Sequence, residues 1–533
     1  MARIAQQAVI EQLTIDGVEY VFGNPGTVEQ GLIDEIHRSD ISYVLALHEA
    51  VALAAADGYA RAAGRLGVVQ LHSSVGLGNG IGTLYQAKRG GSPLLVLVGE
   101  AGVAYDAMDS QMAADLSAMA APVCKDVFRV LHPESTLRIL RRAVQSALTA
   151  PQGPVTVILP ADVMDAMTSE VALPTAVPVT RVAPADSTIA EAAGLLHAPG
   201  KRLILMGDGV ARSGAQAELA AVAADLDADV YGVNDSEVNL DALSPYYCGQ
   251  LGHMFGTTSS KIVQDAASVL VVGTYLFPEV FPSLTSPFAE GARVVHVDLD
   301  TREIGKNHPV NLGISADPAL TLAALHNYLT RNGRAERRRT PRAPDGRPVP
   351  DLVSDSPLEA LTRALAGRLR DWVVFDEALT SSSTVTRYFP PSRPGTFLQT
   401  RGGSLGVGIP GALGARLARP DMDVIAFTGD GGSMYTPQAL WTAARHHVNA
   451  KFIICNNGRY QLLDDNIEQY WSECGQKPHT HPDAFDLHPA IGFAELAKSL
   501  GVPAATLTDA ADADWLATKM LAHDGPFLVD ARV

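Results

Sequence analysis

The sequence predicts an α/β protein made of three doubly wound, parallel-sheet domains. Short runs of Val, Ile and Leu alternate with Ala-rich helical stretches along almost the whole chain. This alternation is typical of parallel sheets covered by helices on both faces. A length of 533 residues exceeds what one hydrophobic core usually serves, so we expect about three domains. With 47% hydrophobic and 19% charged residues, the composition is that of a folded protein.

The predicted strands fall into three blocks. Those of the N-terminal block, residues 1–170, are Val18–Phe22, Tyr43–Leu47, Gly67–Leu71, Leu94–Val98 and Val155–Leu159. Those of the central block, residues 185–330, are Arg202–Met206, Val269–Gly273 and Val294–Leu299. Those of the C-terminal block, residues 352–533, are Trp372–Phe375, Val424–Thr428, Lys451–Cys455 and Phe527–Ala531. Pro-rich residues 171–184 and basic residues 331–351 are predicted to be linkers, although the basic stretch could also be a nucleic-acid-binding tail.

Charge and cysteine content exclude several classes of protein. The chain has 41 basic and 58 acidic residues and a net charge of −17, which argues against a nucleic-acid-binding surface. Four cysteines without a CxxC pair indicate reduced thiols, with neither a disulfide framework nor a zinc site. No apolar run reaches the roughly 18 residues of a membrane span, and the first residues read as an amphipathic helix rather than a signal peptide. We therefore expect a cytoplasmic protein.

Two strand ends in the C-terminal block carry the most informative residues. One predicted strand leads into Gly429-Asp430-Gly431-Gly432 and a helix over 436–447, and the next strand ends at Asn456-Asn457-Gly458. Because the carboxyl ends of parallel strands meet at one edge of a sheet, Asp430 and Asn457 should face one cavity. Carboxylate, amide and carbonyl oxygens suit Mg²⁺, which usually also binds phosphate oxygens. Glycines and a helix N-terminus can hold a diphosphate there.

The segments with this pattern resemble a known family. The C-terminal block is similar to the diphosphate-binding domain of thiamine-diphosphate-dependent enzymes, in which GDG is followed by NN. The whole chain resembles their benzoylformate decarboxylase and acetolactate synthase branch. The segments that carry the resemblance are VFGNPGTVE (21–29), LALHEAVALAAADGYAR (45–61), QLHSSVGLGNGIGTLYQAKRGGSPLLVLVGE (70–100), GGSLGVGIPGALGA (402–415), FTGDGGSMYTPQALWTAARHH (427–447) and NNGRYQLL (456–463).

The resemblance implies residues that hold the cofactor. Asp430, Asn457 and the backbone carbonyl of Arg459 would bind Mg²⁺. Leu405 would wedge thiamine diphosphate into its bent form, and Glu49 would hydrogen-bond its aminopyrimidine ring. The other implied cofactor-binding residues are Gly429, Gly431, Gly432, Asn24, Pro25 and Gly26.

The resemblance also implies that Glu49, His72 and Thr27 are catalytic. Taken alone, Glu49 is an ordinary first-turn glutamate, where a helix N-terminus favours an anion. His72 ends a predicted strand and enters a predicted Ser/Gly loop, and histidine can exchange protons near neutral pH. Thr27 stands where the family has a serine that faces the substrate.

The implied reaction is decarboxylation of a 2-oxo acid through ylide and enamine intermediates. The alternative is a carboligase, similar to acetolactate synthase, that forms 2-hydroxy ketones; a lyase of acyl-CoA thioesters and a non-catalytic binding protein are weaker alternatives. Benzoylformate decarboxylases have a second histidine in the central domain, but residues 273–281 contain none. Glu279, His479 or His481 could replace it. Residues 460–463 are either core or the lining of a pocket for a hydrophobic side chain.

The resemblance finally bears on assembly and on a second nucleotide. It implies that two chains share each cofactor in a homodimer, and that dimers pair into a homotetramer. Acetolactate synthases carry a flavin in the central domain. In this chain, residues 207–214 fit the GxGxxG pattern poorly, so FAD or NAD is not expected. The second GDG motif, Gly207-Asp208-Gly209, lacks a following Asn-Asn pair and is predicted to be a strand-to-helix turn.

Overall fold

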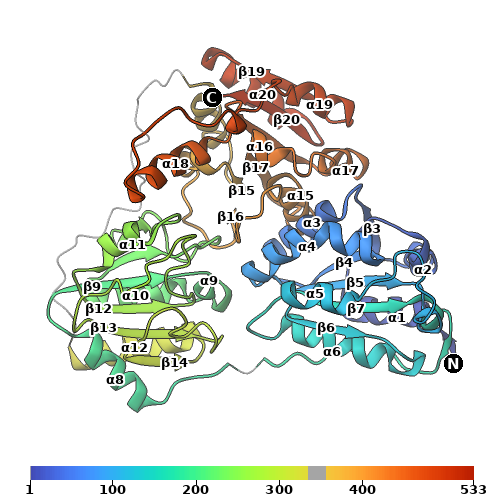
Figure 1. Cartoon of the computed structure of the whole chain (residues 1–533), viewed down its shortest axis with the longest axis horizontal. Coiled ribbons are helices and arrows are strands. Elements are labelled where there is room, and N and C mark those ends of the chain that lie inside the picture. The colour runs from blue at the N-terminus through green and yellow to red at the C-terminus, as the bar shows by residue number, and fades with distance from the viewer. Residues whose placement is uncertain (1, 180, 334–355) are drawn as a thin grey trace. The chain divides into compact units, whose positions relative to one another are not determined.

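The computed structural model describes residues 2–179, 181–333 and 356–533, so most of the basic stretch at 331–351 lies outside the described residues. Three six-stranded sheets and a two-stranded ribbon form the framework (Figure 1). This arrangement confirms the predicted α/β class. The first sheet and all of the third sheet except its edge strand at residues 397–399 belong to one compact unit, and the middle sheet belongs to a second. Residues 171–179 and 181–184 contain no helix or strand, as predicted for a linker.

The first sheet is entirely parallel and has the order β3-β2-β4-β5-β7-β6. Its strands are β2 (Tyr20–Gly23), β3 (Ser42–Leu45), β4 (Gly67–His72), β5 (Leu94–Glu100), β6 (Asp126–Arg129) and β7 (Val155–Pro160). One face packs against α1 (Ala5–Ile15), α2 (Gln30–His37) and α6 (Thr136–Leu148). The other face carries α3 (Glu49–Ala63) and α4 (Ser73–Gly90) (Figure 1). The smaller elements are α5 (Leu116–Ala120), α7 (Ala161–Met164) and the antiparallel pair β1 (Arg3–Ile4) and β8 (Met167–Thr168).

The third sheet has the order β16-β15-β17-β18-β20-β19. Its strands are β15 (Trp372–Glu377), β16 (Phe397–Gln399), β17 (Asp423–Gly429), β18 (Ala450–Asn456), β19 (Ala504–Leu507) and β20 (Phe527–Arg532). Its helices are α13 (Pro357–Ala366), α14 (Ser382–Tyr388), α15 (Gly408–Ala418), α16 (Asp430–Ser433), α17 (Ala439–Arg445), α18 (Gln461–Glu473), α19 (Phe493–Ser499) and α20 (Ala513–Ala522). When the strands of each sheet are numbered in chain order, the first and third sheets have the same order, 2-1-3-4-6-5.

The helices that follow the second strand in these two sheets cross at glycines. A Cβ atom added at Gly58 of α3 would lie 2.1 Å from the carbonyl oxygen of Gly411 in α15. One added at Gly414 would lie 1.8 Å from the carbonyl oxygen of Ala55. The two helix backbones therefore touch directly, because side chains at these positions would not fit.

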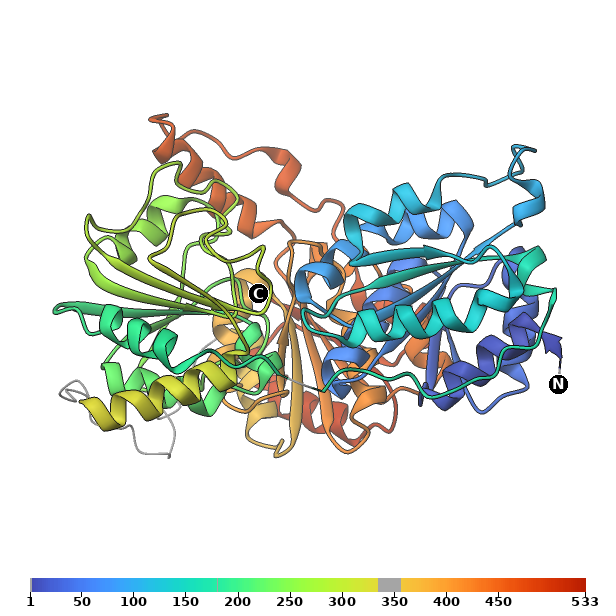
Figure 2. The same cartoon turned by 90° about the horizontal axis from the view of Figure 1, so that it is seen from below.

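The middle sheet is parallel and has the order β11-β10-β9-β12-β13-β14, which in chain order is 3-2-1-4-5-6. Its strands are β9 (Lys201–Met206), β10 (Asp229–Gly232), β11 (Tyr247–Gln250), β12 (Ala266–Val272), β13 (Arg293–Asp298) and β14 (Leu312–Ser315). Its helices are α8 (Asp186–Leu196), α9 (Gly209–Ser213), α10 (Gln216–Leu226), α11 (Gly256–Val263) and α12 (Pro318–Asn332). Figure 2 shows α12, in yellow, lying along one face of this sheet, where α8 and α10 share its apolar core.

Two predicted elements differ from the structure. The Ser/Gly segment after His72, predicted to be a loop, is the first turn of the helix α4. The helix predicted over 436–447 is shorter in the structure, where α17 covers only Ala439–Arg445. A separate short helix, α16, precedes it at Asp430–Ser433. Pro437 lacks a backbone N–H and disfavours helical geometry in the residue before it, so it separates the two helices.

Candidate active site

Glu49 is the first residue of α3 and lies in a buried polar cluster. The residue is only 5% exposed. Its Oε1 accepts a hydrogen bond from Asn24 Nδ2 at 3.2 Å, and its Oε2 accepts one from Asn79 Nδ2 at 3.0 Å. His48 caps the helix, since its Nδ1 accepts from the backbone N–H of Ala50 at 3.1 Å. The carboxylate is thus held between the loop after β2 and helix α4. Sequence reasoning missed Asn79, although it lies within the quoted segment 70–100.

Glycines explain why a Ser/Gly-rich segment becomes helical here. A Cβ at Gly76 would lie 3.3 Å from Glu49 Oε1, and one at Gly80 would lie 2.4 Å from Leu53 Cδ1. The absence of side chains lets α4 approach α3 closely, and the packing outweighs the low helix propensity of glycine. Of the two glycines, Gly76 is the one that leaves room beside the Glu49 carboxylate.

His72 ends β4 and pairs with a glutamate that sequence reasoning missed. Its Nδ1 lies 2.9 Å from Oε2 of Glu29, whose residue is 4% exposed. Burial raises the pKa of Glu29 above its ordinary value, and the nearby His72 opposes this shift. A Cβ at Gly26 would lie 2.0 Å from His72 Nδ1, so glycine lets the loop after β2 lie against the ring. Thr27 begins the short 3₁₀ turn that ends at Glu29.

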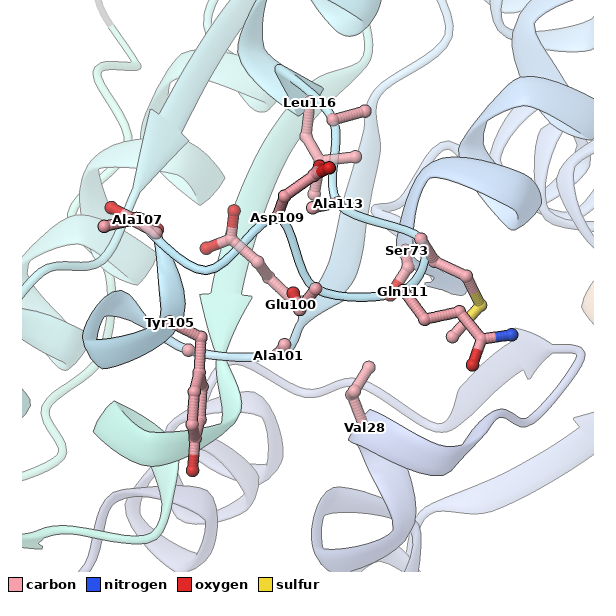
Figure 3. A pocket seen from close by; sticks show the side chains of 15 residues that line it. Val28, Ser73, Glu100, Ala101, Tyr105, Ala107, Asp109, Gln111, Ala113 and Leu116 are labelled. Atoms are coloured by element: carbon pink, nitrogen blue, oxygen red, sulfur yellow. The ribbon is translucent and has the colours of Figure 1, made fainter.

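A cavity of about 360 Å³ adjoins this histidine segment (Figure 3). Val28 and Ser73, the neighbours of Thr27 and His72 in the chain, lie on one side of it. The other lining residues lie between the end of β5 and the start of α5 and include Glu100, Tyr105, Asp109, Gln111 and Met112. Ser74 Oγ donates to the carbonyl oxygen of Met112 at 2.8 Å and so ties this loop to α4. The cavity has a volume suited to a small organic molecule.

Asp430 lies at the carboxyl end of β17 and organises the second cluster. It is 4% exposed, and burial raises the pKa of its carboxyl group while backbone amides oppose the shift. Its Oδ1 accepts from Gly431 N at 2.8 Å, and its Oδ2 accepts from Gly458 N at 2.6 Å. Asn457 Oδ1 accepts from Arg459 N at 3.0 Å. The ends of β17 and β18 therefore meet, as their positions in a parallel sheet predict.

The residues of this second cluster fit a magnesium ion and a diphosphate. The candidate donors are carboxylate, amide and carbonyl oxygens, the set that Mg²⁺ prefers. A Cβ added at Gly429 or Gly458 would meet no atom within 4 Å, so open space lies beside both backbones. Across residues 2–179, 181–333 and 356–533, no three His, Cys, Asp or Glu side chains form a metal-binding group. The second cluster has one acidic donor, Asp430, together with amide and carbonyl oxygens, so it would not form a group of that kind.

Leu405 precedes a segment fixed by a second buried glutamate. Glu377, which ends β15, is 1% exposed. Its Oε1 accepts from Gly406 N at 2.7 Å and its Oε2 accepts from Gly408 N at 2.8 Å. Burial raises the pKa of Glu377, and the backbone amides oppose this shift. Sequence reasoning missed this residue, because a glutamate at a strand end has no distinctive signal.

Several polar residues outside the two clusters have structural partners. Asp208 of the second GDG motif accepts from Ser236 N at 2.8 Å and Ser236 Oγ at 2.7 Å, and α9 begins directly after it. This confirms a strand-to-helix turn. Glu279 is buried and hydrogen-bonded to Ser259. His446 Nε2 accepts from the backbone N–H of Leu45 at 3.0 Å, which connects α17 to the end of β3.

Comparisons with known proteins assign the two clusters to one family. Residues 4–119 match the N-terminal TPP binding domain of thiamine pyrophosphate enzymes, 189–325 their central domain, and 380–531 their C-terminal TPP binding domain. The chain belongs to the thiamine pyrophosphate enzymes. The Glu49 and His72 cluster lies in the N-terminal match, and Asp430 and Asn457 lie in the C-terminal match.

Relatives of this thiamine pyrophosphate enzyme include decarboxylases and synthases. Benzoylformate decarboxylase of Pseudomonas aeruginosa is 29% identical, with 99% of this chain and 98% of that protein covered. A probable acetolactate synthase large subunit of Methanocaldococcus jannaschii is 27% identical, with 98% and 91% covered. A solved 4-hydroxybenzoylformate decarboxylase of Rhodococcus jostii superposes with a TM-score of 0.89 at 27% identity and covers 100% of this chain and 99% of its own. Among the described residues, no helix is both long and apolar enough to span a membrane.

Proposed function

We propose that this protein catalyses the thiamine-diphosphate- and Mg²⁺-dependent decarboxylation of a 2-oxo acid with a hydrophobic side chain. The observation that carries the proposal is the buried Glu49 carboxylate at the start of α3, whose only hydrogen-bond partners among the described residues are two side-chain amides. Such amides can rotate away and leave a carboxylate oxygen for a ligand. Near-complete coverage in both directions with a benzoylformate decarboxylase supports a decarboxylase of similar length.

The first cluster would handle protons. Bound thiamine diphosphate supplies a nucleophilic carbon and accepts the electron pair released when CO₂ leaves. Glu49 would accept a proton from the aminopyrimidine ring or share one with it. Its burial excludes water that would compete for the carboxylate. His72, held by Glu29, would donate a proton to the product or take one from it. Thr27 would hydrogen-bond the substrate from the loop after β2.

The second cluster would hold the diphosphate. Asp430, Asn457 and the carbonyl oxygen of Arg459 would bind Mg²⁺, and backbone amides beside Gly429, Gly431 and Gly432 would contact phosphate oxygens. Leu405 would press against the cofactor, with Glu377 fixing the backbone that follows it. The loop Asn24, Pro25 and Gly26 would close over the pyrimidine end.

Carboligation is the second candidate reaction, because the relatives include a probable acetolactate synthase. In that reaction a second carbonyl compound, rather than a proton, would take up the electron pair. The cavity beside Ser73 gives room for an acceptor molecule. A decarboxylase would release an aldehyde even when an acceptor is present in excess.

The experiment that tests the proposed reaction uses a panel of 2-oxo acids with aliphatic, aromatic and charged side chains. Carbon dioxide and organic products are quantified with and without an acceptor aldehyde or ketone. We expect CO₂ and aldehyde in equal amounts, with the fastest turnover for hydrophobic side chains. If coupled hydroxy ketone is the sole product, the enzyme is a carboligase and the proposed decarboxylase activity is wrong. If no 2-oxo acid is turned over, both proposed activities are refuted.

The same proposal includes a shared site in a homodimer that pairs further into a homotetramer. Exposed apolar side chains flank both clusters: Leu47 and Val75 near Glu49, and Met434 and Tyr435 near Asp430. Their exposure in a single chain supports coverage by a second copy. Mixing inactive Glu49→Gln and Asp430→Asn chains tests this arrangement, because each mixed dimer would regain one intact site. Recovered turnover after subunit exchange would support sharing, and none would refute it.

A further inference from the structure

The loop that carries Asn457 and Arg459 is held through the Arg459 side chain by a buried carboxylate that has no role in the proposed reaction. Asp464 lies in the first turn of α18 and is 3% exposed. Its Oδ1 accepts from Arg459 Nη2 at 3.0 Å, and its Oδ2 lies 2.6 Å from Arg459 Nε. His481 Nδ1 lies 2.6 Å from the same Oδ1. One carboxylate therefore contacts two cationic or potentially cationic side chains from different segments.

The backbone of this loop pairs with the same later segment. Tyr460 N donates to the carbonyl oxygen of Phe485 at 2.8 Å, and Leu487 N donates to that of Gly458 at 2.8 Å. Between them, Arg459 and Asp486 form an antiparallel bridge. The Arg459 guanidinium also lies 3.4 Å from Asp486 Oδ1. The segment after α18 thus behaves as a short strand laid against the loop.

Aromatic packing fixes the far end of this arrangement. Trp471 of α18 is 2% exposed, and its ring centroid lies 4.3 Å from that of His479 and 5.4 Å from that of His481. His481 Nε2 lies 3.4 Å from Glu468 Oε1. Asp464 therefore connects three parts of the chain: the loop at 457–460, helix α18 and the segment 479–487.

Fewer contacts hold the part of the loop that faces Asp430. Gly458 has a φ of +74°, and its backbone N–H bonds Asp430 Oδ2. Asn457 Oδ1, the expected metal ligand, accepts only a local bond from Arg459 N in the described contacts. A loop that turns at a glycine and must present two oxygens to a cation needs contacts with neighbouring segments to fix its backbone. The Arg459 side chain makes such contacts, and the backbone carbonyl of the same residue is the third expected ligand.

We propose that Asp464 is a positioning residue for the metal loop: it anchors Arg459, and so orients the Arg459 carbonyl and the Asn457 amide toward bound Mg²⁺. This inference rests on the proposed function, since it takes Asn457 and Arg459 as metal ligands. Loss of the Asp464 carboxylate leaves the Arg459 guanidinium without its buried partner. The loop then samples orientations in which the two oxygens no longer converge, so the metal and the diphosphate bind less tightly.

The test measures cofactor binding directly by calorimetry, with thiamine diphosphate titrated into the full chain at fixed Mg²⁺. We expect Asp464→Ala to raise the Kd by about tenfold, the low end of the range for residues that orient metal ligands. Asp464→Asn keeps the shape and one acceptor oxygen and should raise the Kd less. Asp465→Asn, which removes the neighbouring exposed charge on α18, is the matched control and should leave the Kd unchanged.

A double-variant cycle separates positioning from a general loss of stability. If Arg459 transmits the effect, Arg459→Ala and the double variant Arg459→Ala/Asp464→Ala should bind as weakly as Asp464→Ala alone. At saturating cofactor, turnover by Asp464→Asn should return to within about twofold of the wild type, because the residue acts through binding. Additive losses in the cycle, or an unchanged Kd in a folded Asp464→Ala protein, would overturn the inference. A wild-type chain that binds no cofactor would instead overturn the proposed function, and the inference with it.

Discussion

The first and third sheets share one strand order, yet equivalent strand ends carry different chemistry. In chain order, the third strand of the first sheet is β4, which ends at His72 and leads into α4. The third strand of the third sheet is β17, which is followed by Asp430. His72 pairs with a buried glutamate, whereas Asp430 is surrounded by backbone amides and open space beside glycines. The shared topology fixes where the strands end. The residues placed there decide whether the end suits proton exchange or metal binding.

The buried glutamates of the two sheets differ in the same way. Glu377 accepts hydrogen bonds from backbone amides of Gly406 and Gly408, which cannot leave without unfolding the start of α15. Within the described part of the chain, Glu49 accepts hydrogen bonds only from the side-chain amides of Asn24 and Asn79, which can change rotamer. A buried carboxylate held by movable partners can exchange them for a ligand. One held by the backbone stabilises the fold.

The largest expected effect comes from Glu49→Gln, which tests this contrast directly. The amide retains the shape but cannot accept a proton from the cofactor, so turnover should fall by about 10²–10⁴-fold. Cofactor affinity measured by calorimetry should change little. Glu377→Gln is the informative counterpart: an NH₂ group facing backbone N–H donors should lower stability by about 1–3 kcal/mol. Full activity of Glu49→Gln would remove the distinction between the two glutamates.

The next effect concerns the two GDG motifs. Asp430→Asn removes the only charged group among the three proposed Mg²⁺ ligands and should weaken Mg²⁺ and cofactor binding by about 100-fold or more. Asp208→Asn changes the equivalent motif of the middle sheet, where the carboxylate bonds Ser236, and should leave cofactor binding unchanged. Both constants come from the same titration. Equal losses in the two variants would contradict the assignment of only one motif to the metal.

A smaller effect is expected at the crossing of α3 and α15. Gly414→Ala places a methyl group on the Ala55 carbonyl oxygen, and such overpacking should cost about 1–3 kcal/mol. Gly194→Ala in α8 is the control, because a Cβ there meets no atom within 4 Å; it should stabilise that helix by about 0.5–1 kcal/mol. Thermal unfolding of both variants checks the opposite signs. A Gly414→Ala protein as stable as the wild type would show that the helices can separate freely.

The smallest effect is a pH dependence at Glu29. Burial raises the pKa of this carboxyl group above 4.5, so the folded state binds a proton more tightly than the unfolded state. Between 4.5 and the raised value, the unfolding free energy of the wild type should fall as pH rises, by at most about 1.4 kcal/mol per pH unit. Glu29→Gln lacks this titration, so its stability relative to the wild type should improve over that range. Denaturation curves at several pH values measure the difference, and parallel pH profiles would contradict it.

Sequence patterns predicted the long buried strands and the two clusters better than the sheet edges. All twelve predicted strands are present, and most of them are continuous apolar runs that are buried; the edge strand β3 is the exception, because only one of its four residues is buried. In the three six-stranded sheets, the strands that were missed have three or four residues, and all but β10 lie at a sheet edge; they are β6, β10, β11, β14, β16 and β19. The two-residue strands β1 and β8 were missed as well. Edge strands are half exposed and lack a continuous apolar run.

The site residues that belong to a sequence motif were predictable. Asp430 and Asn457 follow strands in a fixed pattern, and the structure brings their loops together as expected. Glu29, Asn79 and Glu377 act as partners of other side chains or of the backbone, and their role depends on packing between distant segments. The helix α4 was missed for the same reason, since contacts with α3 compensate for its glycines.

The glycine crossing of α3 and α15 has a mechanical consequence. Where two backbones touch, no intervening side chain can change rotamer to absorb a displacement, so a shift of one helix must move the other. α15 follows Leu405 closely, and α3 begins at Glu49. A ligand that pushes on the Leu405 side would therefore alter the placement of the Glu49 carboxylate, although the extended chain between the two residues would measure roughly 1,200 Å.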